Sequence, residues 1–81
     1  MNHKTWNNPV RIENPDTGLV QTVKTIREAK TVLARSWPIY HGSQYWKAEK
    51  ICDDVLHGRS DAVEARCAFI AAAVEAHFHI H

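Results

Sequence analysis

Three histidines alternate with other residues at the end of the sequence: His77, His79 and His81. On a β-strand, side chains two residues apart point to the same face, so these imidazoles could bind Zn²⁺, Ni²⁺ or Cu²⁺ together. A structural zinc site needs four ligands in a closed tetrahedron, and neither cysteine is near in sequence. We therefore expect a solvated polar edge or adventitious chelation, and keep a metal-binding regulator as an alternative function.

Cys52 lies between His41 and His57 in the sequence, so these residues are the candidates for a catalytic cysteine–histidine pair. A reactive thiolate needs an exposed, electropositive setting, but Cys52 falls at an apolar position of a predicted helix. We expect Cys52 and Cys67 to be two buried small hydrophobic side chains in a reducing compartment. No nucleophile elbow, phosphate-binding loop, HExxH motif or dinucleotide fingerprint occurs. The sequence therefore predicts no enzyme activity and no cofactor.

Trp46 is the most informative single residue, because tryptophan is among the residue types most enriched at protein-binding hot spots. On a helix it would share one face with Lys50, Asp53 and His57, away from the apolar stripe. A large indole on a polar face is unusual. We predict that this face contacts a protein partner. The alternative is that the hairpin loop, the N-terminal segment or the Lys50 stem covers the indole.

The segment 60–76 supplies two further candidates. Small side chains line one side of its predicted helix, at Ala65, Ala68, Ala72 and Ala76, with Phe69 at the margin. Another helix can approach such a side closely, so it packs either against a neighbour within the domain or against a second copy of the chain. Arg66 could hold a carboxylate or phosphate with two hydrogen bonds, or cap another element in a structural role.

Charge is balanced over the whole chain, at +1, but unevenly distributed. Residues 1–50 contain eight Lys or Arg and four acids, and residues 51–81 contain two and five. Nucleic acid could contact the cations of the first predicted helix region, which are Lys24, Arg27, Lys30 and Arg35. No stacking platform accompanies them, and the third predicted helix is too apolar to read bases. We therefore do not expect nucleic-acid binding, and keep it only as an alternative.

The elements that must position these residues follow from hydrophobic spacing. Residues 10–13 alternate apolar and charged side chains, and residues 19–24 form a second, β-branched strand. Between them, residues 14–18 (Asn-Pro-Asp-Thr-Gly) have the composition of a turn. The pattern predicts a β-hairpin.

Three helices are predicted after the hairpin. Thr25 and Glu28 have the spacing of a capping box, and the first helix should run from there toward Ser36 and stop at Pro38. The second should run from about Ser43 to His57, before a left-handed Gly58. The third should start at Ser60 or Asp61. Its predicted inward row, at the spacing of a core stripe, is Val63, Cys67, Ile70 and Val74.

The end of the chain predicts a short third strand with Phe78 and Ile80 facing inward; a fraying extension of the last helix is the alternative. The predicted fold is α+β, of order ββααα with a closing strand, over residues 9–81 after a tail at 1–8. No apolar run approaches the ~20 residues of a membrane span, and no signal peptide follows Met1. We expect a cytoplasmic protein and no membrane partner.

Two stretches of sequence suggest a family. One comprises Ser36-Trp37-Pro38, Gly42, Tyr45, Ala48, Cys52, Gly58 and Ser60, and the other runs from Ala65-Arg66-Cys67-Ala68-Phe69 to Ala76. Together they resemble the small bacterial proteins of domain of unknown function 982, over nearly the whole chain from Val10 to Ala76. The resemblance implies a stand-alone domain and no particular chemistry.

These observations predict a small non-enzymatic protein–protein interaction or accessory domain, with a homodimer as one form it could take. Its candidate surface residues are Trp46, Lys50, Asp53, His57, Phe69 and Arg66.

Overall fold

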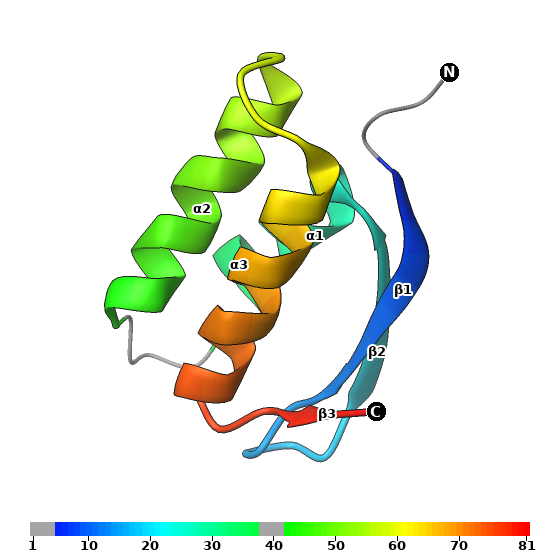
Figure 1. The fold of residues 1–81 in the computed structure, drawn as a ribbon. Coiled ribbons are helices and arrows are strands. Elements are labelled where there is room, and N and C mark those ends of the chain that lie inside the picture. Colours follow the sequence, from blue (N-terminus) through cyan, green and yellow to red (C-terminus); the bar gives the residue numbers. More distant parts are fainter. Residues whose placement is uncertain (1–4, 38–41) are drawn as a thin grey trace.

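The computed structural model describes residues 5–37 and 42–81. Its elements in chain order are β1 (Thr5–Glu13), β2 (Val20–Thr25), α1 (Ile26–Arg35), α2 (Ser43–Leu56), α3 (Ala62–Glu75) and β3 (His79–Ile80). This order confirms the predicted α+β fold, with helices packed on one face of a small sheet (Figure 1). Pro38 and His41, which the sequence places between the first two helices, lie outside the described residues.

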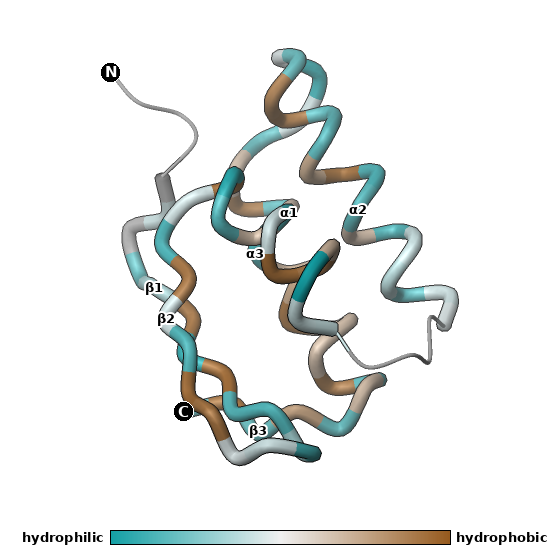
Figure 2. Tube along the Cα trace, turned by 180° about the vertical axis from the view of Figure 1, so that it is seen from behind, coloured by the Kyte–Doolittle hydropathy of each residue, from teal (hydrophilic) through white to brown (hydrophobic). Residues whose placement is uncertain are grey.

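The sheet is antiparallel, with strand order β2-β1-β3. Val10 of β1 pairs with Val23 of β2, and both side chains are buried, whereas Arg11 and its partner Thr22 face solvent. Figure 2 shows the resulting alternation of apolar and polar residues along the two strands. The hairpin is closed by Asn14, whose side-chain Oδ1 accepts from the backbone N–H groups of Asp16 and Thr17.

The first strand begins earlier than the sequence predicted, at Thr5 and not at Val10. The reason is Trp6, which is buried and donates a hydrogen bond from Nε1 to the carbonyl of Ala62, at 2.9 Å. Its ring also packs against Phe69, with centroids 5.7 Å apart. Residues 5–8, assigned to a tail from the sequence, therefore belong to the sheet.

The helix ends follow their local signals. Thr25 and Glu28 form the predicted capping box at the start of α1: the Thr25 hydroxyl accepts from the Glu28 N–H, and the Glu28 carboxylate accepts from the Thr25 N–H. Gly58 adopts a positive φ of 75° after α2, as predicted. After α3 the same left-handed position is occupied by His77, at φ 67°.

The orientation of α3 differs from the prediction. The row expected in the core faces outward: Val63 is 70% exposed, Val74 is 58% exposed and Cys67 is also exposed, while Ile70 is partly buried. The opposite side is buried in its place, through Ala65, Ala68, Phe69, Ala72, Ala73 and Ala76. Both sides of α3 are apolar, so periodicity alone could not choose between them. The alanine side is buried because it lets α2 and the sheet approach closely.

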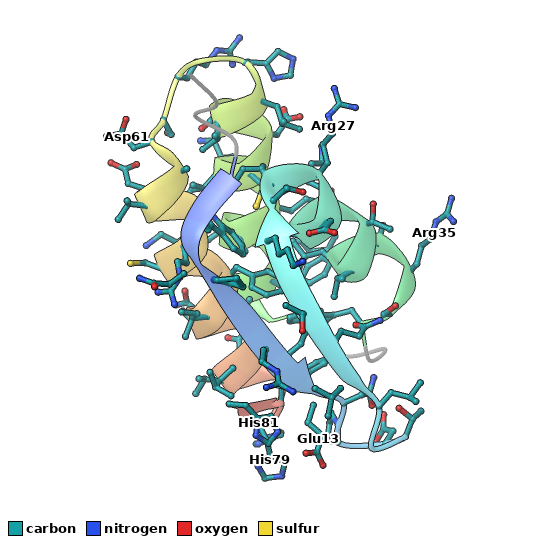
Figure 3. The ribbon with its side chains drawn as sticks, turned by 90° about the vertical axis from the view of Figure 1, so that its right-hand side faces the viewer. Glu13, Arg27, Arg35, Asp61, His79 and His81 are labelled. Atoms are coloured by element: carbon teal, nitrogen blue, oxygen red, sulfur yellow. The ribbon has the colours of Figure 1, made fainter. Side chains whose placement is uncertain are left out.

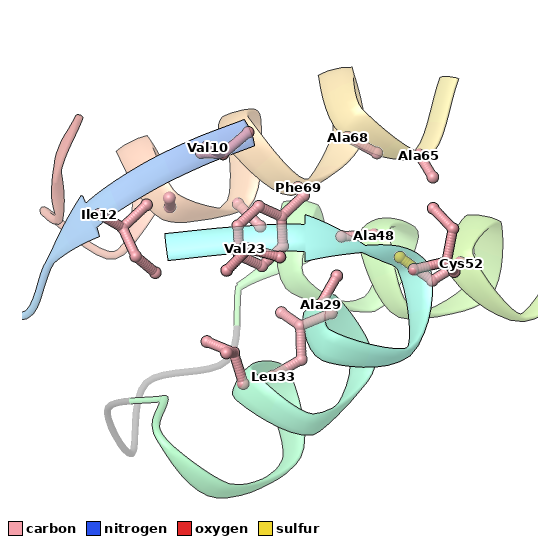
Figure 4. Packing of buried hydrophobic residues seen from close by; sticks show 14 of the residues in the cluster. Val10, Ile12, Val23, Ala29, Leu33, Ala48, Cys52, Ala65, Ala68 and Phe69 are labelled. Atoms are coloured by element: carbon pink, nitrogen blue, oxygen red, sulfur yellow. The ribbon is translucent and has the colours of Figure 1, made fainter. Parts of the chain in front are cut away.

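Phe69 lies at the centre of the core (Figure 4). It is fully buried, and the aromatic rings of Trp6 and Trp37 each lie 5.7 Å from its ring. The inward side chains of α1 and α2, including Leu33, Ala48 and Cys52, complete the same cluster, as their spacing predicted. Among the described residues, no helix has the length and hydrophobicity that crossing a bilayer would require.

The closing strand exists but is only two residues long, and it pairs with Ile12 and Glu13 of β1. Phe78 is buried and stacks on Trp37 at 4.5 Å, as the inward prediction requires. Ile80, also predicted to face inward, is 40% exposed because it lies at the outer edge of the sheet.

Candidate functional site

The predicted Trp46 face is present on α2. Trp46, Lys50 and His57 are exposed, and Asp53 between them is partly buried. The Trp46 indole contacts the Tyr45 ring edge-on, at 5.0 Å and 87°, so its orientation is defined by a buried neighbour. The indole is 58% exposed, so of the predicted covers that the structure describes, neither the hairpin loop nor the Lys50 stem buries it. Residues 1–4 of the N-terminal segment lie outside the described residues.

A shallow groove of about 360 Å³ separates this face of α2 from α1, lined by Lys30, Trp46, Glu49, Lys50 and Asp53. Across it Lys30 Nζ donates to Asp53 Oδ1 at 3.1 Å, which ties the two helices together. This hydrogen bond is the main reason why the pKa of Asp53 is lowered. The groove contains cations and anions in similar number, so it does not select a ligand of one charge.

Arg66 has a structural partner. Its Nε donates to the backbone carbonyl of Asn8 at 2.9 Å, so the side chain links α3 to the first half of β1. Of the two roles that the sequence allowed, this contact matches the structural one.

Phe69 and the alanine side of α3 are buried, so the structure matches the alternative in which this side packs within the domain and is not offered as a contact surface. Phe69 is fully buried, and Ala65, Ala68, Ala72 and Ala76 are buried with it. The alanines pack within the domain, against α2 and the sheet, and not against a second copy.

The most distinctive surface is the one the sequence assigned to the core: the α3 row, which we define as Val63, Cys67, Ile70 and Val74. In Figure 1, α3 lies toward the viewer, with α2 on one flank and β1 on the other. An apolar row at helical spacing is the pattern that packs against another helix. Two of the exposed large hydrophobic side chains of the described residues belong to it. The sequence signal for this surface was a helix with two apolar faces, of which only one can lie in the core.

The two cysteines have different environments. Cys52 is buried, and burial raises the pKa of its thiol to about 11, so it remains protonated at neutral pH. Cys67 is exposed, contrary to the prediction that both would be buried. Cys52 is buried at an apolar position of α2, as its spacing predicted, whereas His57 is exposed directly after that helix. His41 lies outside the described residues.

The three terminal histidines do not share a strand face. His77 ends α3 in the left-handed conformation, and only His79 lies within β3. His81 Nε2 lies 3.0 Å from Glu13 Oε1, and Figure 3 shows these side chains at one end of the sheet. Within residues 5–37 and 42–81, no three His, Cys, Asp or Glu side chains are grouped closely enough to hold a metal ion.

The cations near α1 do not form one patch. Lys30 is paired with Asp53, whereas Arg27 and Arg35 project from α1 at different heights (Figure 3). Glu28 is exposed on the same side of α1 and Lys24 donates its backbone N–H to that carboxylate. The arrangement lacks the continuous positive surface that follows a phosphate backbone.

A comparison with protein families finds a match to the model described as Protein of unknown function (DUF982), over residues 8–80. This match confirms the resemblance seen in the sequence. No curated protein and no solved structure is significantly similar to the chain.

Proposed function

The chain belongs to the family Protein of unknown function (DUF982), and because that description names no activity, we propose a function from the structure: a non-enzymatic protein-interaction domain that uses the α3 row as its contact surface. One observation supports this most directly. An apolar helix face with the spacing of a packing seam is exposed, while the opposite face of the same helix is buried in the core.

The physical argument concerns free energy in water. Burying apolar surface is favourable by roughly 25 cal/mol per Å². A row of exposed valine and cysteine side chains, with the partly buried Ile70 among them, therefore lowers its free energy when a partner covers it. Single exposed hydrophobic residues are ordinary on protein surfaces. The α3 row instead places three exposed side chains and the partly buried Ile70 at i, i+4, i+7 and i+11, which forms a continuous strip. The strip is the feature that supports an interface.

The Trp46 face supports the same function as a second surface. Its indole is held by Tyr45 and flanked by Lys50 and the Lys30–Asp53 pair, which gives an aromatic centre with a charged rim. Interfaces commonly have this composition. We rank it below the α3 row because it contains one large apolar side chain and the row contains several.

Two further parts of the proposal concern chemistry and location. We propose that no catalysis occurs: the Cys52 thiol is buried and protonated, and the groove beside Trp46 is too shallow to exclude water. We also propose that the protein works in the cytoplasm. The two cysteines are free, and an exposed free thiol such as that of Cys67 is typical of a reducing compartment.

The test is photo-crosslinking in the cell of origin. A photoreactive amino acid is placed at Val63 or Val74 of the α3 row, and in the control at Leu19, which is 66% exposed in the hairpin loop. We expect discrete adducts with a polypeptide from the two row positions and far fewer from Leu19. Equal adducts from all three positions, or none from the row, would contradict the proposed function.

A further inference from the structure

The α3 row has a property that its exposure does not require: its spacing reads the same in both directions. The steps from Val63 to Cys67, Ile70 and Val74 are four, three and four residues, and a valine stands at each end. When a second α3 lies antiparallel along the row, Val63 therefore comes opposite Val74 of the other copy, and Cys67 comes opposite Ile70. A two-fold symmetric interface needs this kind of self-matching surface.

We infer that the α3 row binds the α3 row of a second copy of this chain, with the two helices antiparallel. This inference rests on the proposed function and names its partner. The spacing of four and three residues is the alternation of a and d positions in a coiled coil, where each side chain inserts between residues of the facing helix.

Side-chain size favours the antiparallel direction. Every layer of the antiparallel pair is either valine on valine or cysteine on isoleucine, so the two central layers have equal volume. A parallel pair would put Cys67 opposite Cys67 and Ile70 opposite Ile70, which leaves one layer underfilled and the next overfilled. Protein interiors are close-packed, and such unevenness is unfavourable. The helix macrodipoles also oppose each other only in the antiparallel pair.

Charge does not prevent this arrangement. The row is bordered by Glu64 on one flank and by Arg66 on the other. Across an antiparallel seam each flank meets the same flank of the second copy, so Glu64 lies nearest Ala71 of that copy. The two Arg66 side chains are offset by five residue steps along the seam, roughly 7.5 Å. Like charges therefore do not meet, and Arg66 keeps its bond to the Asn8 carbonyl. No charged side chain has to be buried, which would be costly.

The small surface area that two α3 rows can bury against each other predicts weak association. Eleven residue steps at about 1.5 Å each make a row of roughly 17 Å. A contact between two helices of that length falls at the lower end of specific interfaces, below about 1,200 Å² in total. We therefore expect a reversible dimer with a dissociation constant on the order of 1–100 µM.

The first experiment is sedimentation velocity on the full chain at about 1 to 500 µM, chosen to bracket that range. We expect the wild type to shift from monomer to dimer, and Val63→Asp/Val74→Asp to remain monomeric throughout. The control Leu19→Asp places the same charge on an exposed hairpin residue and should dimerise like the wild type. Circular dichroism checks that each variant is folded. A wild type that is monomeric at every concentration, or a dimer that the row substitutions leave intact, overturns the inference.

Disulfide formation tests the direction of the helices. Cys52 is buried, so Cys67 is the accessible thiol of the native chain. In Ile70→Cys the introduced thiol should face Cys67 of the second copy, within reach of a disulfide in two symmetric places. We expect mild oxidation to link this variant fully and the wild type poorly, with mass spectrometry locating the bond. Efficient Cys67-to-Cys67 bonds in the wild type would overturn the antiparallel pairing.

The two proposals fail separately. Adducts in the cell that contain only other polypeptides, together with a strictly monomeric purified protein, overturn the second copy as partner and leave the interaction surface standing. The absence of row-specific adducts contradicts the function itself.

Discussion

At the scale of single residues, Glu75 has the most unusual position. It belongs to the last turn of α3, where a negative charge opposes the helix dipole. Its carboxylate instead accepts from the Gln44 N–H at 3.1 Å and from the Ser43 hydroxyl at 3.4 Å, at the start of α2. The N-cap residue of α2 is Gly42, which has no side chain to do this. One helix thus supplies the cap of another.

The contact of Glu75 with the start of α2 also explains why residue 42 is a glycine. A Cβ at Gly42 would collide with the Glu75 carboxylate. Glu75→Ala should lower the free energy of unfolding by about 1 kcal/mol, the usual value of a helix N-cap. Gly42→Ala should lower it by a similar amount of about 1 kcal/mol, because it displaces the carboxylate. In the Glu75→Ala background, Gly42→Ala should lower the free energy of unfolding by less, because no carboxylate is left to displace.

Urea denaturation of the four proteins in this double-mutant cycle measures the coupling. Glu64→Ala, which removes an exposed acid from the other end of α3, is the matched control and should change stability by only a few tenths of a kcal/mol. If Gly42→Ala costs the same in both backgrounds, the Glu75 cap is not the reason for the glycine.

At the scale of elements, α3 decides how the domain is packed. Its alanine side lies against α2 and the sheet, and its only large inward side chain, Phe69, fills the space between Trp6 and Trp37. The other helices each have one apolar face and one polar face, so each has one way to pack. α3 has two apolar faces, and its orientation is set by its neighbours.

A pair of substitutions tests which face is inside. Ala72 is fully buried, whereas its neighbour Ala71 is only partly buried, toward the outer side. Ala72→Leu should lower stability by about 1–3 kcal/mol through overpacking. Ala71→Leu, the same change one residue away, should stay within about 0.5 kcal/mol. Thermal unfolding at low protein concentration makes the comparison; equal losses would contradict the orientation of α3.

The same elements show what the sequence could predict. The hairpin, the capping box at Thr25 and the end of α2 at Gly58 depend on a few adjacent residues, and all were predicted correctly. The inward face of α3 could not be predicted, because it depends on how closely alanines let distant segments approach. Trp6 was missed for a similar reason: its partners, Ala62 and Phe69, are far along the chain. Of the candidate surface residues, Trp46 is exposed and Phe69 is buried; whether Trp46 contacts a partner stays a prediction.

At the scale of the whole molecule, the chain has the compactness expected of a folded domain of its length. The radius of gyration is 11.6 Å, and a folded chain of this length is expected to have about 11.7 Å. Cys52 lies in the core cluster, to which every helix contributes, so its thiol becomes accessible only when the domain opens. Cys67 on α3 is accessible in the folded state.

Thiol labelling should therefore show two distinct phases. Cys67 should react with a disulfide reagent at once at neutral pH. Cys52, with its pKa raised to about 11, should react only at the rate at which the molecule unfolds. Cys67→Ser should lose the fast phase and keep the slow one. Two fast phases in the folded wild type would mean that the core around Cys52 is open.

The bond between Arg66 and Asn8 has a consequence for how this domain meets others. β3 pairs only with Ile12 and Glu13, so the first half of β1 could in principle template an extra strand from another molecule. Pro9 offers no N–H there, and the guanidinium of Arg66 already occupies the Asn8 carbonyl. Pairing of another strand with this half of β1, one route to uncontrolled assembly of small sheets, is thereby discouraged.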